Sequence, residues 1–176
     1  MNSISKWFSK FAVTALIAVL SFVSVSAWAD DPTGPLAVVN VVLHPGGSFQ
    51  AKTSDITGSA KVGPKGEVSA SNIVVKLSNL QTGIGLRDTH TKKHLDVEQF
   101  PEATLSNATG TDGKGTGTIK IRGIEKPITG TYEVKGAFLV AHFPLTLSDF
   151  KIDGIKYMGI GVDDKVTLDV TVPVAK

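Results

Sequence analysis

Apolar and polar residues alternate over most of the chain after residue 36, and a period of two is typical of β-strands with one buried face. Every second residue from Val166 to Val174 is apolar, and the residues between them are polar or proline. A second run, from Ala137 to Leu147, has the same period. These runs predict two long strands near the C-terminus.

Shorter runs rich in Val, Ile, Leu and Thr lie between clusters of glycine, which marks turns. They predict further strands at Leu36–Leu43, Phe49–Thr53, Thr57–Val62, Val68–Leu77, Ala103–Ala108, Thr118–Arg122 and Ile128–Val134. The apolar parity changes within Val68–Leu77, as a β-bulge requires. About eight strands joined by tight turns favour an all-β fold, an antiparallel barrel that closes its own edges. A two-sheet sandwich is the alternative, which alternation alone does not separate from a barrel.

One stretch, from Ile84 to Leu95, has no alternation. Leu86, His90 and His94 recur at a spacing of four, which predicts one short helix inserted between the strands. Pro101 follows and ends this segment before the next strand.

The first 29 residues have the features of a secretory signal. Lys6 and Lys10 lie near the start, an apolar run of about 15 residues follows, and Ala27-Trp28-Ala29 supplies small residues at a cleavage site. A membrane span needs about 20 apolar residues. We therefore predict cleavage before Asp30, a periplasmic location, and no membrane span in the mature protein, a single domain of residues 30–176.

Charge and cysteine content exclude two classes of explanation. The signal carries two of the 18 basic residues and none of the 16 acidic ones, so its removal lowers the net charge from +2 to 0. A neutral domain has no basic excess with which to neutralise nucleic-acid phosphates, and no nucleic-acid partner is predicted. The chain has no cysteine, so disulfides do not contribute to its stability.

Three motifs in order give the chain a family resemblance. They are Arg87-Asp88-Thr89-His90 followed by Phe100-Pro101, the run from Gly117 to Ile128 with Gly123 and Lys126-Pro127, and Asp149-Phe150-Lys151-Ile152. In this order they resemble the YceI-like family of periplasmic, lipocalin-like barrels that bind polyisoprenoids and related lipids. The resemblance implies that this protein binds or carries a long-chain isoprenoid or related amphiphilic lipid, is not an enzyme and needs no cofactor. It leaves a homodimer open.

The apolar faces of the predicted strands supply the residues expected to line a hydrophobic cavity: Ile119, Ile121, Tyr132, Leu139, Phe143, Leu145, Leu168 and Val170. Arg87, His90 and Lys92 on the predicted helix are the expected contacts for a headgroup at the cavity mouth. Two alternatives remain. Side chains of a small barrel can fill its interior, leaving a structural or stress-associated protein without a ligand, and the basic residues can simply solvate the helix.

The histidine spacing raises a metal-dependent enzyme as a third hypothesis. His90 and His94, four residues apart on a helix, can face one metal ion, with Asp88, Asp96 or His44 as a third ligand. Two histidines are an incomplete zinc signal, and no glutamate follows His90 as in the H-E-x-x-H motif. Because the chain also lacks a Gly-x-Ser-x-Gly motif, we predict no metal site and no catalytic residue.

Overall fold

The computed structural model describes residues 32–157 and 159–175. The predicted signal segment and its cleavage site before Asp30 lie outside these residues. The strands are β1 (Leu36–His44), β2 (Ser48–Thr53), β3 (Ile56–Thr57), β4 (Ala60–Val62), β5 (Val68–Ala70), β6 (Ile73–Lys76), β7 (Glu102–Thr111), β8 (Lys114–Ile121), β9 (Ile124–Lys135), β10 (Phe138–Thr146), β11 (Lys156–Tyr157), β12 (Ile160–Val162) and β13 (Lys165–Pro173). The helix α1 spans Gly85–Leu95, and two 3-10 turns, η1 (Leu77–Asn79) and η2 (Leu147–Phe150), lie among the strands.

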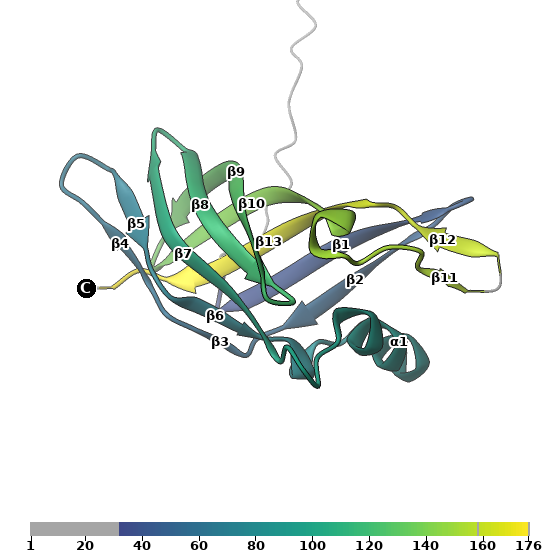
Figure 1. Cartoon of the computed structure of the whole chain (residues 1–176). Coiled ribbons are helices and arrows are strands. Elements are labelled where there is room, and N and C mark those ends of the chain that lie inside the picture. Colours follow the sequence, from purple (N-terminus) through teal and green to yellow (C-terminus); the bar gives the residue numbers. More distant parts are fainter. Residues whose placement is uncertain (1–31, 158, 176) are drawn as a thin grey trace, which may run out of the picture. The chain divides into compact units, whose positions relative to one another are not determined.

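All the paired strands are antiparallel and belong to one curved sheet (Figure 1). The hydrogen-bonded order is β11-β12-β1-β13-β10-β9-β8-β7-β5-β4, with β2 paired to β1, and β6 paired to both β7 and β3. α1 lies at the end of the sheet where β11 and β12 are found (Figure 1). The predicted all-β antiparallel fold with one short helix is therefore confirmed.

The sheet does not close into a continuous ladder. β2 pairs with β1 and β3 pairs with β6, but Ser54 and Asp55 separate β2 from β3. Backbone hydrogen bonds outside the ladder connect β2 with the segment after η1, and the C-terminal segment with β4. Lys52 and Gln81 exchange hydrogen bonds of 2.7 and 2.9 Å, and the Ala175 N–H donates to the Ala60 carbonyl at 2.7 Å.

Two predicted strands are each divided in the structure. Thr57–Val62 becomes β3 and β4, with Gly58 between them at φ +107°. Val68–Leu77 becomes β5 and β6, with Asn72 between them at φ +54°. Positive φ interrupts an extended strand, so the parity change that predicted a bulge marks a break instead. Both β5 and β6 still pair with β7, whose own register shifts between Ser106 and Thr109.

The predicted turn at Gly123 joins β8 to β9. Ile121 pairs with Ile124, so Arg122 and Gly123 form a two-residue loop with φ of +49° and +74°. Positive φ at both positions is the geometry of a type I′ turn, which matches the twist of the strands it joins. Glycine at the second position adopts this φ without steric cost.

The inward faces of β10 and β13 carry much of the core. Leu139, Phe143 and Leu145 on β10 are buried, as are Val166 and Val170 on β13. The two strands pair over nine residues, with Phe143 opposite Leu168. The alternation therefore predicted the correct buried faces. α1 is the only α-helix among the described residues, begins one residue after the predicted helix, and no described helix is long and apolar enough to cross a membrane.

Candidate functional site

The interior contains a cavity of about 350 Å³ beside α1. We call it the large cavity. Its apolar lining comes from β1, β2, α1 and the segment before it, η2, the segments around β11 and β12, and β13: Val39, Val41, Leu43, Phe49, Ala51, Leu80, Ile84, Leu86, Leu95, Leu147, Ile152, Ile155, Ile160, Val162 and Val166. Its polar lining is limited to Arg87, His90, Thr91 and His94 on α1 and Lys156 on β11. The cavity therefore has an apolar wall with a strip of polar residues along the helix.

Exposed apolar side chains mark where the large cavity meets solvent. Ile84 is 54% exposed, Leu86 57% and Ile160 43%, although all three line the cavity. We call these three residues the mouth. They place the opening between the start of α1 and β12. Exposed aliphatic groups beside a largely apolar cavity suit the entry of an apolar chain.

A compact set of hydrogen bonds holds the first turn of α1. Asp88 Oδ1 accepts hydrogen bonds from the Thr82 backbone N–H at 2.6 Å and from the Thr82 hydroxyl at 2.5 Å. These bonds hold the pKa of the Asp88 carboxyl below its usual value. The Arg87 Nη2 donates to the Thr82 carbonyl at 3.0 Å. Arg87 and Asp88 of the first motif therefore connect the first turn of α1 to Thr82, in the segment that precedes the helix.

Arg87 also contacts the cavity wall. Its guanidinium carbon lies 4.3 Å from the centre of the Phe49 ring on β2, a cation–π contact. The Nε of Arg87 is buried and has no hydrogen-bond partner among the described residues. A buried N–H without a partner is costly, and an acceptor in the cavity reaches it only after the side chain shifts.

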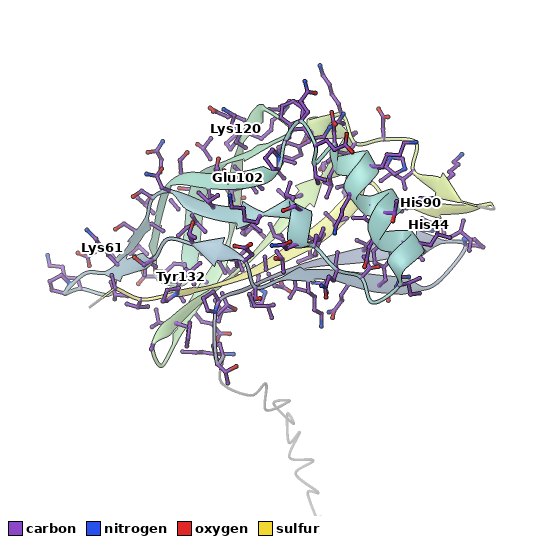
Figure 2. All side chains as sticks on the ribbon, turned by 90° about the horizontal axis from the view of Figure 1, so that it is seen from below. His44, Lys61, His90, Glu102, Lys120 and Tyr132 are labelled. Atoms are coloured by element: carbon purple, nitrogen blue, oxygen red, sulfur yellow. The ribbon has the colours of Figure 1, made fainter. Side chains whose placement is uncertain are left out.

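The two helix histidines face the same cavity. His90 and His94 both line it, and Figure 2 shows His90 on α1, far from Tyr132 on β9. Partial burial lowers the pKa of His94, and the nearby His90 lowers it further. Among the described residues, no group of three or more His, Cys, Asp or Glu side chains is arranged to hold a metal ion. Of the third ligands considered, His44 instead contacts Asp163 at 3.3 Å, and Asp88 is bonded to Thr82.

A second, small cavity of about 80 Å³ lies at the other end of the interior. Four of the residues expected to line a ligand cavity line this one: Tyr132, Leu139, Phe143 and Val170. The ring of Tyr132 occupies space above a glycine, since a Cβ placed on Gly110 would lie 2.4 Å from Tyr132 Cε1. The small cavity is the remainder left between these large side chains.

The other four expected lining residues, Ile119, Ile121, Leu145 and Leu168, border neither cavity. We call them the filled layer. Leu168 stands opposite Val39 on one side and Phe143 on the other, and these two partners line the large and the small cavity. On β10, Leu145 lies between Phe143 and Leu147, which likewise line different cavities. The layer therefore separates the two cavities.

Two of the three residues expected to contact a headgroup lie at the large cavity. Arg87 and His90 line the large cavity together, and Lys92 does not. Sequence reasoning did not select the wall residues Val39, Val41 and Phe49, although it predicted their strands. Their signal was the alternation Ala37, Val39, Val41, Leu43 in β1.

The three sequence motifs meet at one corner of the fold. A Cβ on Gly123 would lie 3.1 Å from the Phe100 ring, so the aromatic residue of the first motif packs on the turn of the second. Arg122 in that turn donates a hydrogen bond to the carbonyl of Lys151 in the third. Phe150, beside it, is 1% exposed. These motifs therefore stabilise the fold, and only Arg87 and His90 in the first motif and Ile152 in the third also line the large cavity.

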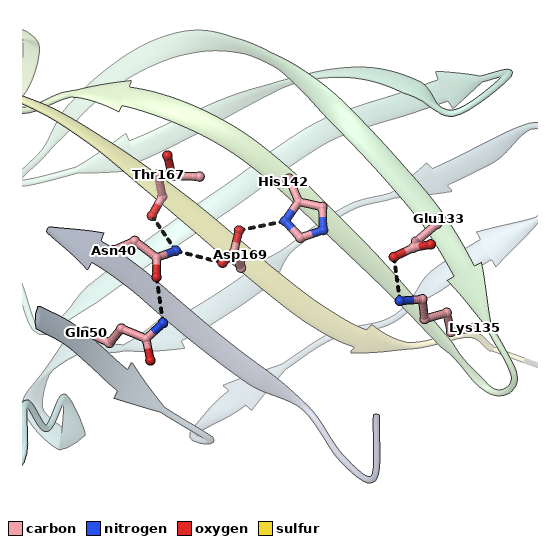
Figure 3. A network of polar contacts seen from close by, with 7 residues as sticks. All are labelled: Asn40, Gln50, Glu133, Lys135, His142, Thr167 and Asp169. Atoms are coloured by element: carbon pink, nitrogen blue, oxygen red, sulfur yellow. Dashed lines mark hydrogen bonds and ion pairs between the residues drawn. The ribbon is translucent and has the colours of Figure 1, made fainter. Parts of the chain in front are cut away.

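The outer face of the sheet carries a chain of polar contacts (Figure 3). Gln50 donates to Asn40 at 2.7 Å, Asn40 donates to Asp169 at 2.7 Å, and Asp169 contacts His142 Nδ1 at 2.6 Å. The chain crosses β2, β1, β13 and β10 on the face opposite the wall residues Val39 and Val41. It connects β1, β2 and β13, which contribute to the wall of the large cavity, with their neighbour β10.

Comparison with known proteins gives the family. Solved structures with similar folds include BcnA of Burkholderia cenocepacia, with 17% identity, a TM-score of 0.61, and coverage of 79% of this chain and 96% of that one. A polyisoprenoid binding domain from Saccharophagus degradans has 14% identity, a TM-score of 0.53, and coverage of 78% and 95%. A mutant CJ YCEI protein with a monobromobimane guest has 15% identity, a TM-score of 0.51, and coverage of 72% and 85%.

No curated protein matches the chain. At identities this low, similarity to solved structures establishes only the fold. The family is established by a match to the sequence model of a domain family. The YceI-like domain matches residues 35–174, which is most of the chain and includes all the described strands. The chain belongs to the YceI-like family.

Proposed function

We propose that the protein binds an amphiphilic lipid of the isoprenoid type, with the hydrocarbon chain in the large cavity and the headgroup at α1. The observation that carries this proposal is the division of the cavity lining. Fifteen of its residues are apolar, and the five polar ones lie on α1 and β11. An amphiphile has the same division, because its chain avoids water and its headgroup does not.

The energetics favour a chain over a polar ligand. Each buried methylene group contributes about 0.8 kcal/mol, and association and ordering offset part of the total. Arg87 is the headgroup contact in this proposal, because it brings a positive charge from the helix to the cavity lining. Family membership and the polyisoprenoid binding domain among the structural neighbours support this proposal. Both point to a binding protein and not to an enzyme.

Export to the periplasm is part of the proposal. YceI-like proteins are generally periplasmic, and residues 1–29 have the pattern of a signal. Both tryptophans, Trp7 and Trp28, lie in that segment. Mature protein that begins at Asp30 has tyrosine fluorescence only. Tryptophan emission from protein recovered from the periplasm would exclude this cleavage.

Lipid extraction tests the binding function. Protein purified without detergent after expression of the full chain is extracted with organic solvent, and the extract is analysed by mass spectrometry. We expect one amphiphile per protein molecule. An empty protein that also takes up no added isoprenoid or fatty acid would leave the family fold as a structural barrel without a ligand.

A pair of charge-matched variants tests the headgroup contact. Arg87→Gln should weaken the binding of a chain with an anionic headgroup about tenfold or more, because a charged hydrogen bond is lost. The control is Lys92→Gln, which removes the same charge from the same helix at a residue outside the cavity lining. Equal effects of the two variants would show that α1 acts only through its net charge.

A further inference from the structure

The depth of the large cavity is limited by side chains and not by the length of the sheet. Beyond Val166 on β13, the next inward residue is Leu168, which belongs to the filled layer. Beyond Leu147, the next inward residue on β10 is Leu145, which is 8% exposed. Past these two residues the interior opens again into the small cavity of about 80 Å³, which shares lining residues such as Val68, Gly115 and Gly130 with an open groove.

The volume of the large cavity sets the amount of chain that fits. A volume of 350 Å³ holds roughly a dozen carbon atoms, if each methylene group occupies about 30 Å³, close to the share of a water molecule in the liquid. An isoprene unit has five carbons, so the cavity holds between two and three units. A longer polyisoprenoid would leave most of its chain in solvent at the mouth, where further carbons gain little.

Resting on the proposed function, we infer that the ligand is a lipid with a single hydrocarbon chain of about twelve to fifteen carbons, of which about twelve lie inside the cavity, and that Leu145 and Leu168 set this limit. Two chemical classes have such chains, namely acyl chains of medium length and isoprenoids of three units. The inference concerns the chain and holds for either class. It distinguishes this protein from a carrier of long polyisoprenoids.

The position of Leu168 makes it the direct barrier. Val39 in the large cavity and Phe143 in the small cavity are its cross-strand partners on either side. Leu145 stands opposite Val166, which lines the large cavity, and precedes Leu147 in the same wall. Shortening either leucine reduces the one inward side chain between a residue that lines the large cavity and a residue that lines the small one.

A series of chain lengths tests the inference on the unaltered protein. Carboxylates with unbranched chains of 8 to 20 carbons, and isoprenoid carboxylates of two, three, four and eight units, are titrated against protein stripped of lipid. We expect affinity to rise about fourfold per methylene up to roughly 12 to 15 carbons and then to level off, in both series. A continued rise through 20 carbons and to eight units would overturn the length limit while leaving the binding function intact. If no chain of any length binds, the binding function itself fails.

Three variants locate the limit. Leu145→Ala joins the two cavities and should move the plateau to chains about five carbons longer, given the volume it opens at about 30 Å³ per carbon. Leu77→Ala is the matched control, because Leu77 is 7% exposed, lies in the same core and borders neither cavity. It should leave the plateau unchanged. An equal shift in both variants, or none in Leu145→Ala, would contradict the assignment of the barrier.

Ala51→Leu works in the opposite direction and guards against loss of folding in Leu145→Ala. Ala51 lines the large cavity, and three added carbons should move the plateau to chains about three carbons shorter. Thermal unfolding of each variant shows which of them fold. A plateau that does not move in folded Ala51→Leu would overturn the inference without Leu145→Ala.

Discussion

The two ends of the interior are both lined mainly by apolar side chains and hold very different amounts of free space. Around the small cavity, large rings face glycines: Tyr132 covers Gly110, and a Cβ on Gly130 would lie 2.7 Å from Phe143 Cβ. Around the large cavity, the apolar lining is mostly leucine, isoleucine and valine without a glycine, and the helix above it keeps Leu86 57% exposed. Free volume in this fold therefore depends on which side chain stands opposite each wall position. Hydrophobicity alone does not distinguish the two ends.

The glycines of the filled end should be the least tolerant positions. A Cβ on Gly130 would lie 2.2 Å from the carbonyl oxygen of His142, so Gly130→Ala must push β9 away from β10. We expect a loss of about 3 kcal/mol in the free energy of unfolding, at the upper end for overpacking. Urea denaturation measures it, with Gly46→Ala as control, since no atom lies within 4 Å of that position. Equal stabilities would show that the strands are not tightly packed there.

Adding volume at the two ends should have opposite effects. Leu145→Trp overpacks the filled layer and should cost about 1–3 kcal/mol of stability. Ala51→Leu adds volume where space exists, so it should leave stability nearly unchanged and weaken binding of a chain that fills the cavity about 50-fold, from three displaced methylenes. A thermal melt and a lipid titration on each variant separate the effects. If Ala51→Leu destabilised the protein as strongly as Leu145→Trp, the comparison between the two ends would be lost.

The cation–π contact offers a smaller test of the open end. Phe49→Leu keeps an apolar wall but removes the ring under the Arg87 guanidinium, and the loss should be about 1 kcal/mol of stability. A double-mutant cycle with Arg87→Gln isolates the pair. No coupling between the two substitutions would mean that Phe49 acts only as part of the wall.

The smallest effect expected is that of pH at the open end. Burial lowers the pKa of His94 in the folded protein, whereas the unfolded chain keeps the usual pKa of 6.5. Below pH 6.5 the unfolded chain therefore binds a proton at His94 more readily than the folded protein does. Folding stability should therefore fall as pH decreases from 6.5 through the lowered pKa, and remain level above 6.5. His94→Gln should remove this part of the pH dependence, as measured by denaturation between pH 5 and 8. An unchanged profile would assign the dependence to another group.

The sequence predicted the fold better than the site, for a physical reason. Alternation reports which face of a strand is buried, and it identified Phe143, Leu145 and Val170 correctly as inward residues. Whether an inward residue fills space or borders a cavity depends on the residues beside it on neighbouring strands, such as Gly130 on β9 next to Phe143 on β10. That pairing follows from register, which the alternation of a single strand does not contain. His90 was found because Leu86, His90 and His94 recur at a spacing of four, which identifies one face of a helix, and Arg87 was found as a basic residue on the same predicted helix.

Breaks in the strands were harder to predict. Asn72 has φ +54°, and asparagine is one of the few residues other than glycine that adopts this conformation readily. Its effect appeared in the sequence only as a change of parity, which a bulge would also produce. The contribution of the family motifs to the fold was also hard to predict, because Gly123 meets Phe100 and Arg122 bonds to Lys151 across long separations in the sequence.

A crystal structure with a brominated chain tests the central claim most directly. A 14-carbon carboxylate carrying bromine at its terminal carbon would be bound to the protein, and the bromine located by anomalous scattering. We predict one bromine in the large cavity next to Val166 and Leu168, with the carboxylate near Arg87. A bromine in the small cavity, on the outer face near Asp169, or at no ordered position would contradict the division of the interior into an open binding end and a filled end.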